Sequence, residues 1–138
     1  MDSARAIENL LYRYAELIDA GDLDGVAALF EHGSVMGQHG PAAVRELYAA
    51  TTRIHEPAGT PLTHHVVTNP IVEVDESAGT AGCRSRFTVL QATDALPLQP
   101  VAAGRYVDTF TRVDGRWWFA SRTMHLDLTG DLSQHLLL

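Results

Sequence analysis

The spacing of apolar residues changes part-way along the chain, and this change constrains the fold more than any other feature of the sequence. In the first part, Ile7, Leu11, Tyr14 and Ile18 recur at helical spacing, which places them on one face of a helix over residues 3–20. Later in the chain the apolar runs become rich in β-branched residues, which is typical of strands. We therefore expect an α+β protein in which helices come first and strands follow.

Glycine, proline and aspartate divide this pattern into elements. Gly21 suits the end of the first helix, and Asp22 can cap a second, short helix. Pro41 suits the first turn of a third helix that reaches about Ile54, and residues 93–100 are expected to form a loop. The remaining elements are expected to be a short strand at 34–36, long strands at 65–74, 80–92, 101–113 and 116–127, and a packed terminal segment at 128–138.

The connection between the last two long strands has the clearest turn signal in the chain. Asp114-Gly115 favours a tight hairpin, so these strands should be antiparallel neighbours. Pro70, Gly82 and Gly104 interrupt strand-like runs and are candidates for bulges or bends. If the sheet is strongly curved, a hollow will remain between it and the helices packed on one of its faces.

Composition limits the functional classes that need to be considered. The chain has 138 residues, of which 46% are hydrophobic and 20% charged, and this fits one globular domain over residues 1–138. The net charge of −7 argues against a nucleic-acid partner. No apolar stretch suits a membrane span or a signal peptide, and the single Cys83 fits a reducing compartment, so we expect a cytoplasmic protein. The chain contains no lysine, which excludes Schiff-base chemistry, and its cysteine and histidine spacing favours no metal site.

Asp19 and His65 are the pair with the clearest chemical potential. An imidazole with a carboxylate partner is an effective general base near neutral pH. Each residue also has a simpler explanation: Asp19 as a solvated residue of the last helical turn, and His65 as a satisfied core or surface histidine. His64 and His65 are adjacent on a strand and must point to opposite faces. The residues alone leave open which of the two points inward.

The order of these features resembles the nuclear transport factor 2-like, or SnoaL-like, superfamily. The resemblance covers nearly the whole chain and rests on the first-helix segment ending at Asp19, on His65-Val-Val-Thr-Asn69 and on the hairpin Asp114-Gly-Arg-Trp-Trp-Phe119. It implies a cone-shaped α+β barrel, in which three N-terminal helices pack on a strongly curved mixed or antiparallel sheet and close a pocket. Members include scytalone dehydratase, bile-acid 7α-dehydratase and γ-hexachlorocyclohexane dehydrochlorinase, and also subunits without catalytic activity.

The resemblance also assigns roles to individual residues. It implies that His65 is the inward-facing catalytic base, that Asp19 supports it, and that Tyr14 and Arg122 assist the reaction from the pocket wall. Packing in the core would explain Tyr14 equally well, and Arg122 could instead form a surface or dimer ion pair. Strand alternation places Arg122 on the same face as Trp118.

The family resemblance and the pair of Asp19 and His65 together imply a cofactor-independent lyase or isomerase of the dehydratase or dehydrohalogenase type. Such an enzyme would abstract a proton from a small hydrophobic ring substrate, such as an aromatic, terpenoid, steroid or polyketide molecule. The alternative is a non-catalytic ligand-binding module or a partner subunit of an oxidative enzyme. Leu90 favours this alternative, because it corresponds to the position of the second catalytic histidine of scytalone dehydratase. A homodimer is expected under either hypothesis. The side chains expected to line the pocket are Leu17, Phe30, Val67, Phe87, Val89, Tyr106, Phe110 and Trp118.

Overall fold

The computed structural model describes residues 2–137 of the chain. The helices are α1 (Ser3–Asp19), α2 (Leu23–Ala28) and α3 (Gly40–Thr51). The strands are β1 (Ser34–Val35), β2 (Gln38–His39), β3 (Thr63–Asp75), β4 (Thr80–Thr93), β5 (Leu96–Val113) and β6 (Arg116–Thr129).

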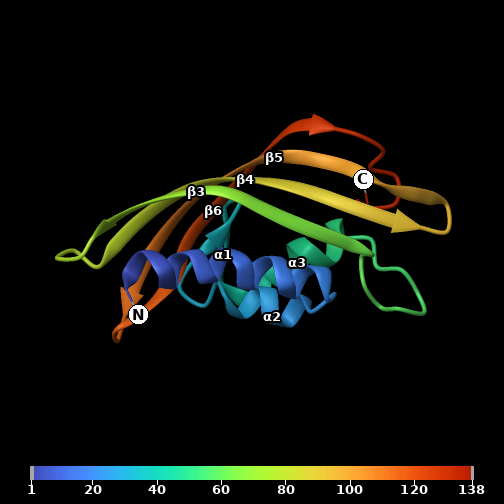
Figure 1. Cartoon of the computed structure of the whole chain (residues 1–138). Coiled ribbons are helices and arrows are strands. Elements are labelled where there is room, and N and C mark those ends of the chain that lie inside the picture. Colours follow the sequence, from blue (N-terminus) through green and yellow to red (C-terminus); the bar gives the residue numbers. More distant parts are fainter. Residues whose placement is uncertain (1, 138) are drawn as a thin grey trace.

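The helices lie together on one side of a six-stranded sheet that arches over them (Figure 1). The strand order is β2-β1-β6-β5-β4-β3, so the sheet is open, with β2 and β3 at its edges. β1 is parallel to β6, whereas the other neighbouring strands are antiparallel. The predicted α+β fold class, with three N-terminal helices on a mixed sheet, is confirmed.

The residues at which α1 and α2 begin follow from their N-terminal capping residues. Asp2 accepts a hydrogen bond from the backbone N–H of Arg5 at 2.8 Å, and Asp22 accepts one from Gly25 at 2.8 Å. Gly21 follows α1 with a φ of 72°, the left-handed conformation that favours glycine after a helix. No helix within residues 2–137 is long and apolar enough to cross a membrane.

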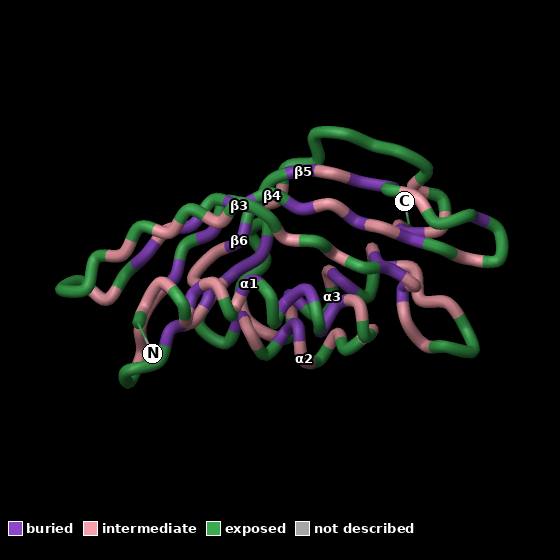
Figure 2. Tube along the Cα trace, in the orientation of Figure 1, coloured by how far each residue is buried: buried purple, intermediate pink, exposed green. Residues whose placement is uncertain are grey.

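Several irregularities in strand pairing bend the long strands, and two of them lie at or beside predicted breaks. The register of β3 against β4 shifts between Thr68 and Ile71, next to the predicted break at Pro70. A second shift between β5 and β6 lies at Gly104, where a Cβ atom would be 2.0 Å from the carbonyl oxygen of His125. Bulges increase the local twist of a strand, and the sheet curves around the helices accordingly (Figure 1). Along β4 buried residues alternate with less buried ones, whereas β3 alternates mainly between partly buried and exposed residues (Figure 2).

The prediction of a loop at residues 93–100 is wrong. β4 continues to Thr93, the chain turns at once, and β5 begins at Leu96, which is buried and pairs with Thr93. The prolines of this segment do not prevent pairing, because Pro100 lies next to a register shift between β4 and β5, where a strand tolerates proline. The β4–β5 hairpin is therefore longer than the sequence predicts.

The C-terminal segment packs against the end of α3. Leu136 forms a β-bridge with Thr52, and the N–H of Leu137 donates to the carbonyl of Thr51 at 2.9 Å. The side-chain amide of Gln91, on β4, donates to the carbonyl of Gln134 at 2.8 Å. Of the packed terminal segment expected at residues 128–138, only the part from about Leu132 packs in this way; Leu128 and Thr129 belong to β6 and are exposed, and Leu138 lies outside the described residues.

The outer face of the sheet exposes several apolar side chains. Ile71 on β3 and Val107 on β5 flank Arg84 in one row across the strands, and both are nearly half exposed. Val66 is exposed on the same strand as Ile71. The homodimer expected from the sequence stays a prediction.

Candidate active site

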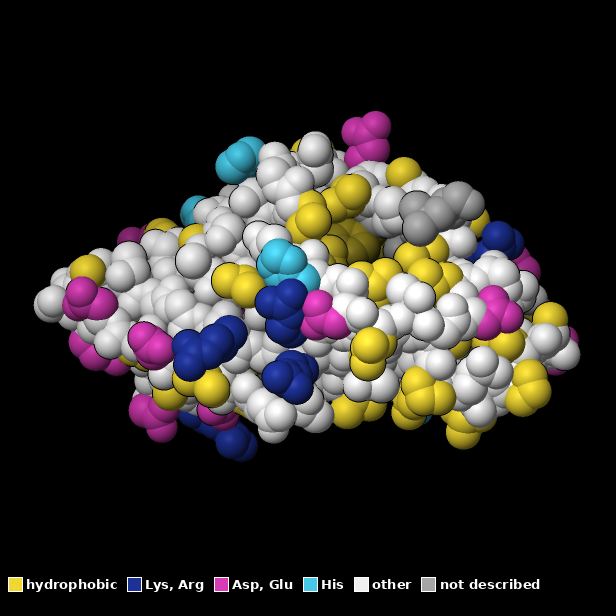
Figure 3. All heavy atoms as spheres, turned by 90° about the horizontal axis from the view of Figure 1, so that it is seen from above, with side chains coloured by type: hydrophobic (Ala, Val, Ile, Leu, Met, Phe, Trp, Pro, Cys, Tyr) yellow, Lys and Arg dark blue, Asp and Glu magenta, His cyan; other side chains and the backbone are white. Residues whose placement is uncertain are grey.

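A cavity of about 210 Å³ lies between the curved sheet and helices α1 and α3. Its wall is mostly apolar and contains a few polar side chains: Tyr14, Ile18, Tyr48, Thr51, Thr52, His65, Phe87, Val89, Ala102, Tyr106, Met124, Leu126, His135 and Leu136. Figure 3 shows a hollow in the molecular surface with a hydrophobic floor. A mostly apolar cavity with a few convergent polar groups is the usual form of a small-molecule site.

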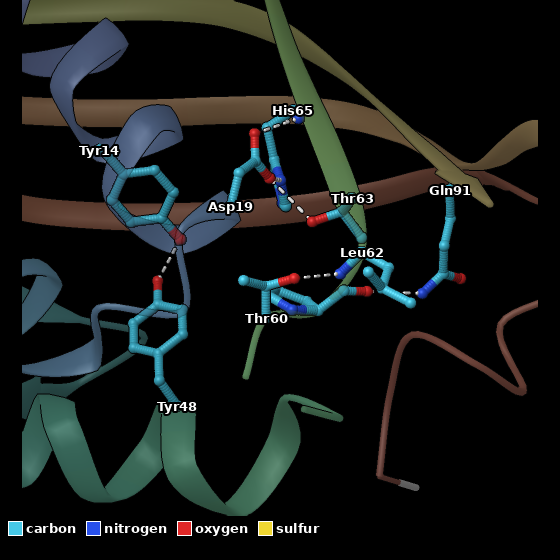
Figure 4. Close-up of polar contacts among 9 residues, drawn as sticks. Tyr14, Asp19, Tyr48, Thr60, Leu62, Thr63, His65 and Gln91 are labelled. Atoms are coloured by element: carbon cyan, nitrogen blue, oxygen red, sulfur yellow. Dashed lines mark hydrogen bonds and ion pairs between the residues drawn. The ribbon is translucent and has the colours of Figure 1, made fainter. Parts of the chain in front are cut away.

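The carboxylate of Asp19 and the imidazole of His65 are in direct contact. His65 Nδ1 lies 2.6 Å from Asp19 Oδ1, and the backbone N–H of His65 donates to Asp19 Oδ2 at 2.8 Å. The hydroxyl of Thr63 also donates to Asp19 Oδ1, at 2.8 Å (Figure 4). Asp19 ends α1 and His65 lies near the start of β3, so the pair joins the helical layer to the sheet.

These contacts define the ionisation state of Asp19 and the tautomer of His65. Burial raises the pKa of Asp19, but the hydrogen bonds from His65 and Thr63 and the charge of His65 outweigh it, and the pKa is lowered overall. Because a carboxylate only accepts hydrogen bonds, His65 Nδ1 must carry a hydrogen. Nε2 is then the basic nitrogen of a neutral His65, whose side chain is only 8% exposed.

His65 is the inward-facing member of the histidine pair. Its side chain lines the cavity, whereas the neighbouring His64 is exposed on the opposite face of β3. This arrangement places the inward histidine next to the carboxylate, as the family resemblance implies.

The hydroxyl groups of Tyr14 and Tyr48 form a hydrogen bond at the cavity wall (Figure 4). Burial raises the pKa of both tyrosines, so both remain protonated at neutral pH. In a hydrogen-bonded pair of neutral hydroxyls, one hydrogen lies between the oxygens and the other is available to a ligand. The sequence contains no signal for the pairing of Tyr48 with Tyr14.

Arg122 lies behind the cavity wall and forms an ion pair with Asp108. Its Nε and Nη2 atoms donate to the two carboxylate oxygens of Asp108 at 2.8 and 3.0 Å, and both side chains are 0% exposed. The guanidinium carbon lies 3.6 Å from the ring centroid of Tyr106 and 4.3 Å from that of Tyr14. Arg122 therefore supports two aromatic residues of the wall and does not itself line the cavity.

A bulge on β6 explains why Arg122 and Trp118 do not lie on the same face, as strand alternation predicts. The pairing of β5 with β6 shifts register between Thr109 and Phe110, where Ala120 is an extra residue on β6. Strict alternation would place Arg122 with Trp118, but the extra residue moves Arg122 inward. Trp118 lies away from the cavity, with its ring 5.0 Å from that of His32 and beneath Arg116.

Four other expected pocket residues belong to the core or lie beside it. The ring of Phe30 stacks on that of Phe119 with the centroids 4.8 Å apart, and the ring centroid of Phe110 lies 4.9 Å from that of Phe119. Leu17 is buried in the same core and Val67 packs at its edge. Helical and strand patterns identify inward faces but do not separate cavity wall from packed core. Phe87, Val89 and Tyr106 line the cavity as expected, with Phe87 stacked on Tyr106 at 4.5 Å.

His135 is a polar residue of the cavity that sequence reasoning missed. It lies on the C-terminal segment, is buried, and its ring centroid is 6.0 Å from that of His65. Burial, together with the charge of His65, lowers the pKa of His135 to about 4, so its ring is neutral at physiological pH. Leu90, where the family resemblance suggests a second histidine, is not part of the cavity wall and lies in a hollow outside it with His64.

Comparison with known proteins agrees with this architecture. The sequence profile of the SnoaL-like domain matches residues 1–123. The chain belongs to the SnoaL-like domain family. A search of curated proteins gives no match.

Solved structures of similar SnoaL-like fold come from several bacteria. A protein of unknown function from Mycobacterium tuberculosis is 27% identical, with a TM-score of 0.73 over 94% of this chain and 79% of that chain. A Novosphingobium aromaticivorans protein provisionally named as a scytalone dehydratase is 28% identical, with a TM-score of 0.72 over 93% of this chain and 86% of that chain. Hexachlorocyclohexane dehydrochlorinase from Novosphingobium barchaimii is 20% identical, with a TM-score of 0.70 over 95% of this chain and 90% of that chain, a likeness that shows the fold alone.

Proposed function

We propose that this SnoaL-like protein is a cofactor-independent lyase or isomerase that removes a proton from carbon in a small hydrophobic ring substrate. The observation that carries the proposal is the contact between Asp19 and His65 at a mostly apolar cavity. Asp19 accepts the Nδ1 hydrogen, and Nε2 of His65 is then free to act as the general base. The carboxylate stabilises the imidazolium that forms when His65 takes up the proton.

The tyrosine pair supplies the second half of the proposed chemistry. Proton removal from carbon leaves an electron pair that must be accepted by a neighbouring activating group. The free hydroxyl hydrogen of Tyr14 or Tyr48 can donate to an oxygen in that group or to a departing substituent. Loss of a substituent gives an alkene, as in a dehydratase or dehydrohalogenase, and return of the proton to another carbon gives a double-bond isomer.

A non-catalytic binding module is the competing function. That hypothesis expects Asp19 and His65 to be far apart, or His65 to point outward, and the observed contact favours the enzyme instead. The Novosphingobium aromaticivorans protein provisionally named as a scytalone dehydratase gives independent support for a dehydratase-like activity. No cofactor is required by the proposed reaction.

Exchange of carbon-bound hydrogen for deuterium tests the proposal with simple ring compounds in place of the natural substrate. Ring ketones such as 1-indanone and 2-tetralone contain a hydrogen next to a carbonyl and are small enough to serve as probes. In D₂O the wild-type protein should accelerate exchange at this carbon, as measured by mass spectrometry. His65→Gln should abolish the acceleration, because general-base catalysis contributes roughly 10²–10⁴-fold.

His64→Gln is the matched control, since His64 is adjacent to the proposed base but exposed on the other face of β3. This variant should exchange at the wild-type rate. Equal rates for His65→Gln and the wild type would contradict the proposal, as would binding of these ketones by the wild type without any exchange.

A further inference from the structure

His135 is an unusual residue to find in the wall of an apolar cavity. Its Nδ1 atom is shielded from solvent and has no hydrogen-bond partner within residues 2–137. A buried polar atom without a partner loses its hydrogen bonds to water without replacement, so such atoms are rare in folded proteins. The side chain nevertheless lines the same cavity as His65, with no hydrogen bond between the two rings in this part of the chain.

The backbone holds this side chain in place from both sides. The carbonyl of His135 accepts a hydrogen bond from the N–H of Arg53 at 3.0 Å, and its own N–H donates to the carbonyl of Leu132 at 3.0 Å. The next residue, Leu136, is bridged to Thr52 at the end of α3. These contacts are made by the main chain, so they position the imidazole without using its polar atoms.

We propose that His135 is a ligand-contacting residue, which hydrogen-bonds an uncharged oxygen of the substrate beside the carbon that His65 deprotonates. This inference rests on the proposed function and narrows its substrate class to hydrophobic rings with a carbonyl or hydroxyl group. The ring centroids of the two histidines are 6.0 Å apart, so both rings can contact neighbouring atoms of one bound molecule. A neutral imidazole offers one donor and one acceptor, which matches a neutral oxygen better than a carboxylate or a halogen.

The chemical step balances without any further reactant. His65 Nε2 takes the proton from the carbon next to the carbonyl, and the electrons of the broken C–H bond form a C=C bond. The carbonyl π electrons move to the oxygen, which becomes an enolate and accepts a hydrogen bond from the N–H of neutral His135. The C=O bond then re-forms in one of two ways. In a substrate with a C=C bond next to the enolate, the far carbon of that bond takes the proton from His65 and the double bond shifts; in a substrate with a hydroxyl on the next carbon, that hydroxyl leaves as water with the proton.

Two ring compounds of nearly equal size can test whether His135 recognises oxygen. 1-Indanone has a carbonyl group, and indane is the same ring system without it. Their dissociation constants can be measured by NMR titration with the wild type, His135→Leu, His135→Gln and Leu136→Val. Leu136→Val is the matched control, because Leu136 lines the cavity from the same segment and has no polar side-chain atom.

We expect His135→Leu to weaken 1-indanone binding about 5- to 10-fold relative to indane, the usual effect of one lost hydrogen bond. Leu136→Val should change the two affinities in parallel, and His135→Gln, which retains a donor, should preserve part of the preference. A purely structural role of His135 would also lower both affinities together. In the wild type, 1-indanone should shift the ¹⁵N resonances of the His135 ring and indane should not, which tests the contact even if His135→Leu does not fold.

An unchanged ratio of the two affinities in His135→Leu, or failure of the wild type to bind either compound, would overturn the assignment of His135. A different result would contradict the proposed function. If 1-indanone binds with a preference that depends on His135 but its carbon-bound hydrogen does not exchange in D₂O, then the cavity recognises oxygen without acting as a base.

Discussion

Asp19 accepts hydrogen bonds from both N–H groups of His65, the backbone N–H at 2.8 Å and the ring Nδ1 at 2.6 Å. The same carboxylate therefore fixes the main chain at the start of β3 and the orientation of the imidazole that projects from it. Each contact limits movement of the other, because both oxygens belong to one rigid group. A catalytic base must be held in a productive orientation, and this double contact achieves that with a single side chain.

Replacement of Asp19 by asparagine should slow proton abstraction without preventing a ligand from binding in the cavity. Asparagine has only one oxygen, and its NH₂ group would oppose an N–H of His65, so the ring loses its orientation and its stabilising charge. We expect Asp19→Asn to slow hydrogen–deuterium exchange of 1-indanone by roughly 10²-fold, within the range of general-base effects. Exchange rates at saturating 1-indanone provide the measurement.

Asp24→Asn is a suitable control for this substitution, because Asp24 is exposed and pairs with Arg45 at the surface. It should leave the exchange rate unchanged. If Asp19→Asn and Asp24→Asn gave the same rate as the wild type, the contact between Asp19 and His65 would have no catalytic role.

The neutral state of His135 should make the stability of the protein sensitive to mild acid. Its pKa is lowered from 6.5 to about 4, mainly by burial and then by the charge of His65, with Asp19 opposing. The unfolded chain thus binds this proton at higher pH than the folded chain does. The stability contributed by a neutral His135 is complete above pH 6.5 and is lost as the pH falls towards 4, by on the order of 3 kcal/mol.

Urea denaturation between pH 7.5 and pH 4 measures this effect as a difference between variants. His135→Gln should lose less stability than the wild type over this range, because it has no imidazole to protonate. His64→Gln should follow the wild type, since His64 is exposed. Parallel curves for the wild type and His135→Gln would mean that His135 titrates normally in the folded protein.

Local sequence signals predicted the helices and turns, but not the full composition of the cavity. Asp22 caps a helix and Asp114-Gly115 turns a hairpin through contacts within a few residues, and such effects are visible in one sequence. The inward position of Arg122 depends on a bulge that alternation does not show. His135 reaches the cavity only because its segment pairs with the distant end of α3, so its role depends on tertiary contacts.

Loss of one member of the buried ion pair between Arg122 and Asp108 should destabilise the protein more than loss of both. Asp108→Asn leaves the Arg122 guanidinium without its counter-charge at a site with 0% exposure, which should cost about 3–5 kcal/mol. The double variant with Asp108→Leu and Arg122→Met removes both charges and should be less destabilised than Asp108→Asn. Chemical denaturation at pH 7 gives both values.

Glu73→Gln is the control for this pair, because Glu73 and its partner Arg84 are both more than half exposed on the sheet surface. Exposed ion pairs contribute roughly 0–1 kcal/mol, so this variant should be close to the wild type. A cost for Asp108→Asn no larger than that for Glu73→Gln would show that Arg122 does not need its partner.

Gly104 should not tolerate a side chain, because backbone and ring atoms of the neighbouring strands lie too close to it. A Cβ atom at this position would lie 2.0 Å from the carbonyl oxygen of His125 and 2.7 Å from the ring of Phe87, a residue of the cavity wall. We expect Gly104→Ala to destabilise the protein by about 2–3 kcal/mol, as overpacking of a core does, and to weaken 1-indanone binding through displacement of Phe87. Gly82 is a matched strand glycine, at which the nearest atom to an added Cβ is the Asp108 carbonyl oxygen at 3.8 Å, so Gly82→Ala should be nearly neutral. Urea denaturation of both variants compares them directly, and equal stability would show that the bulge at Gly104 can relax to accept a methyl group.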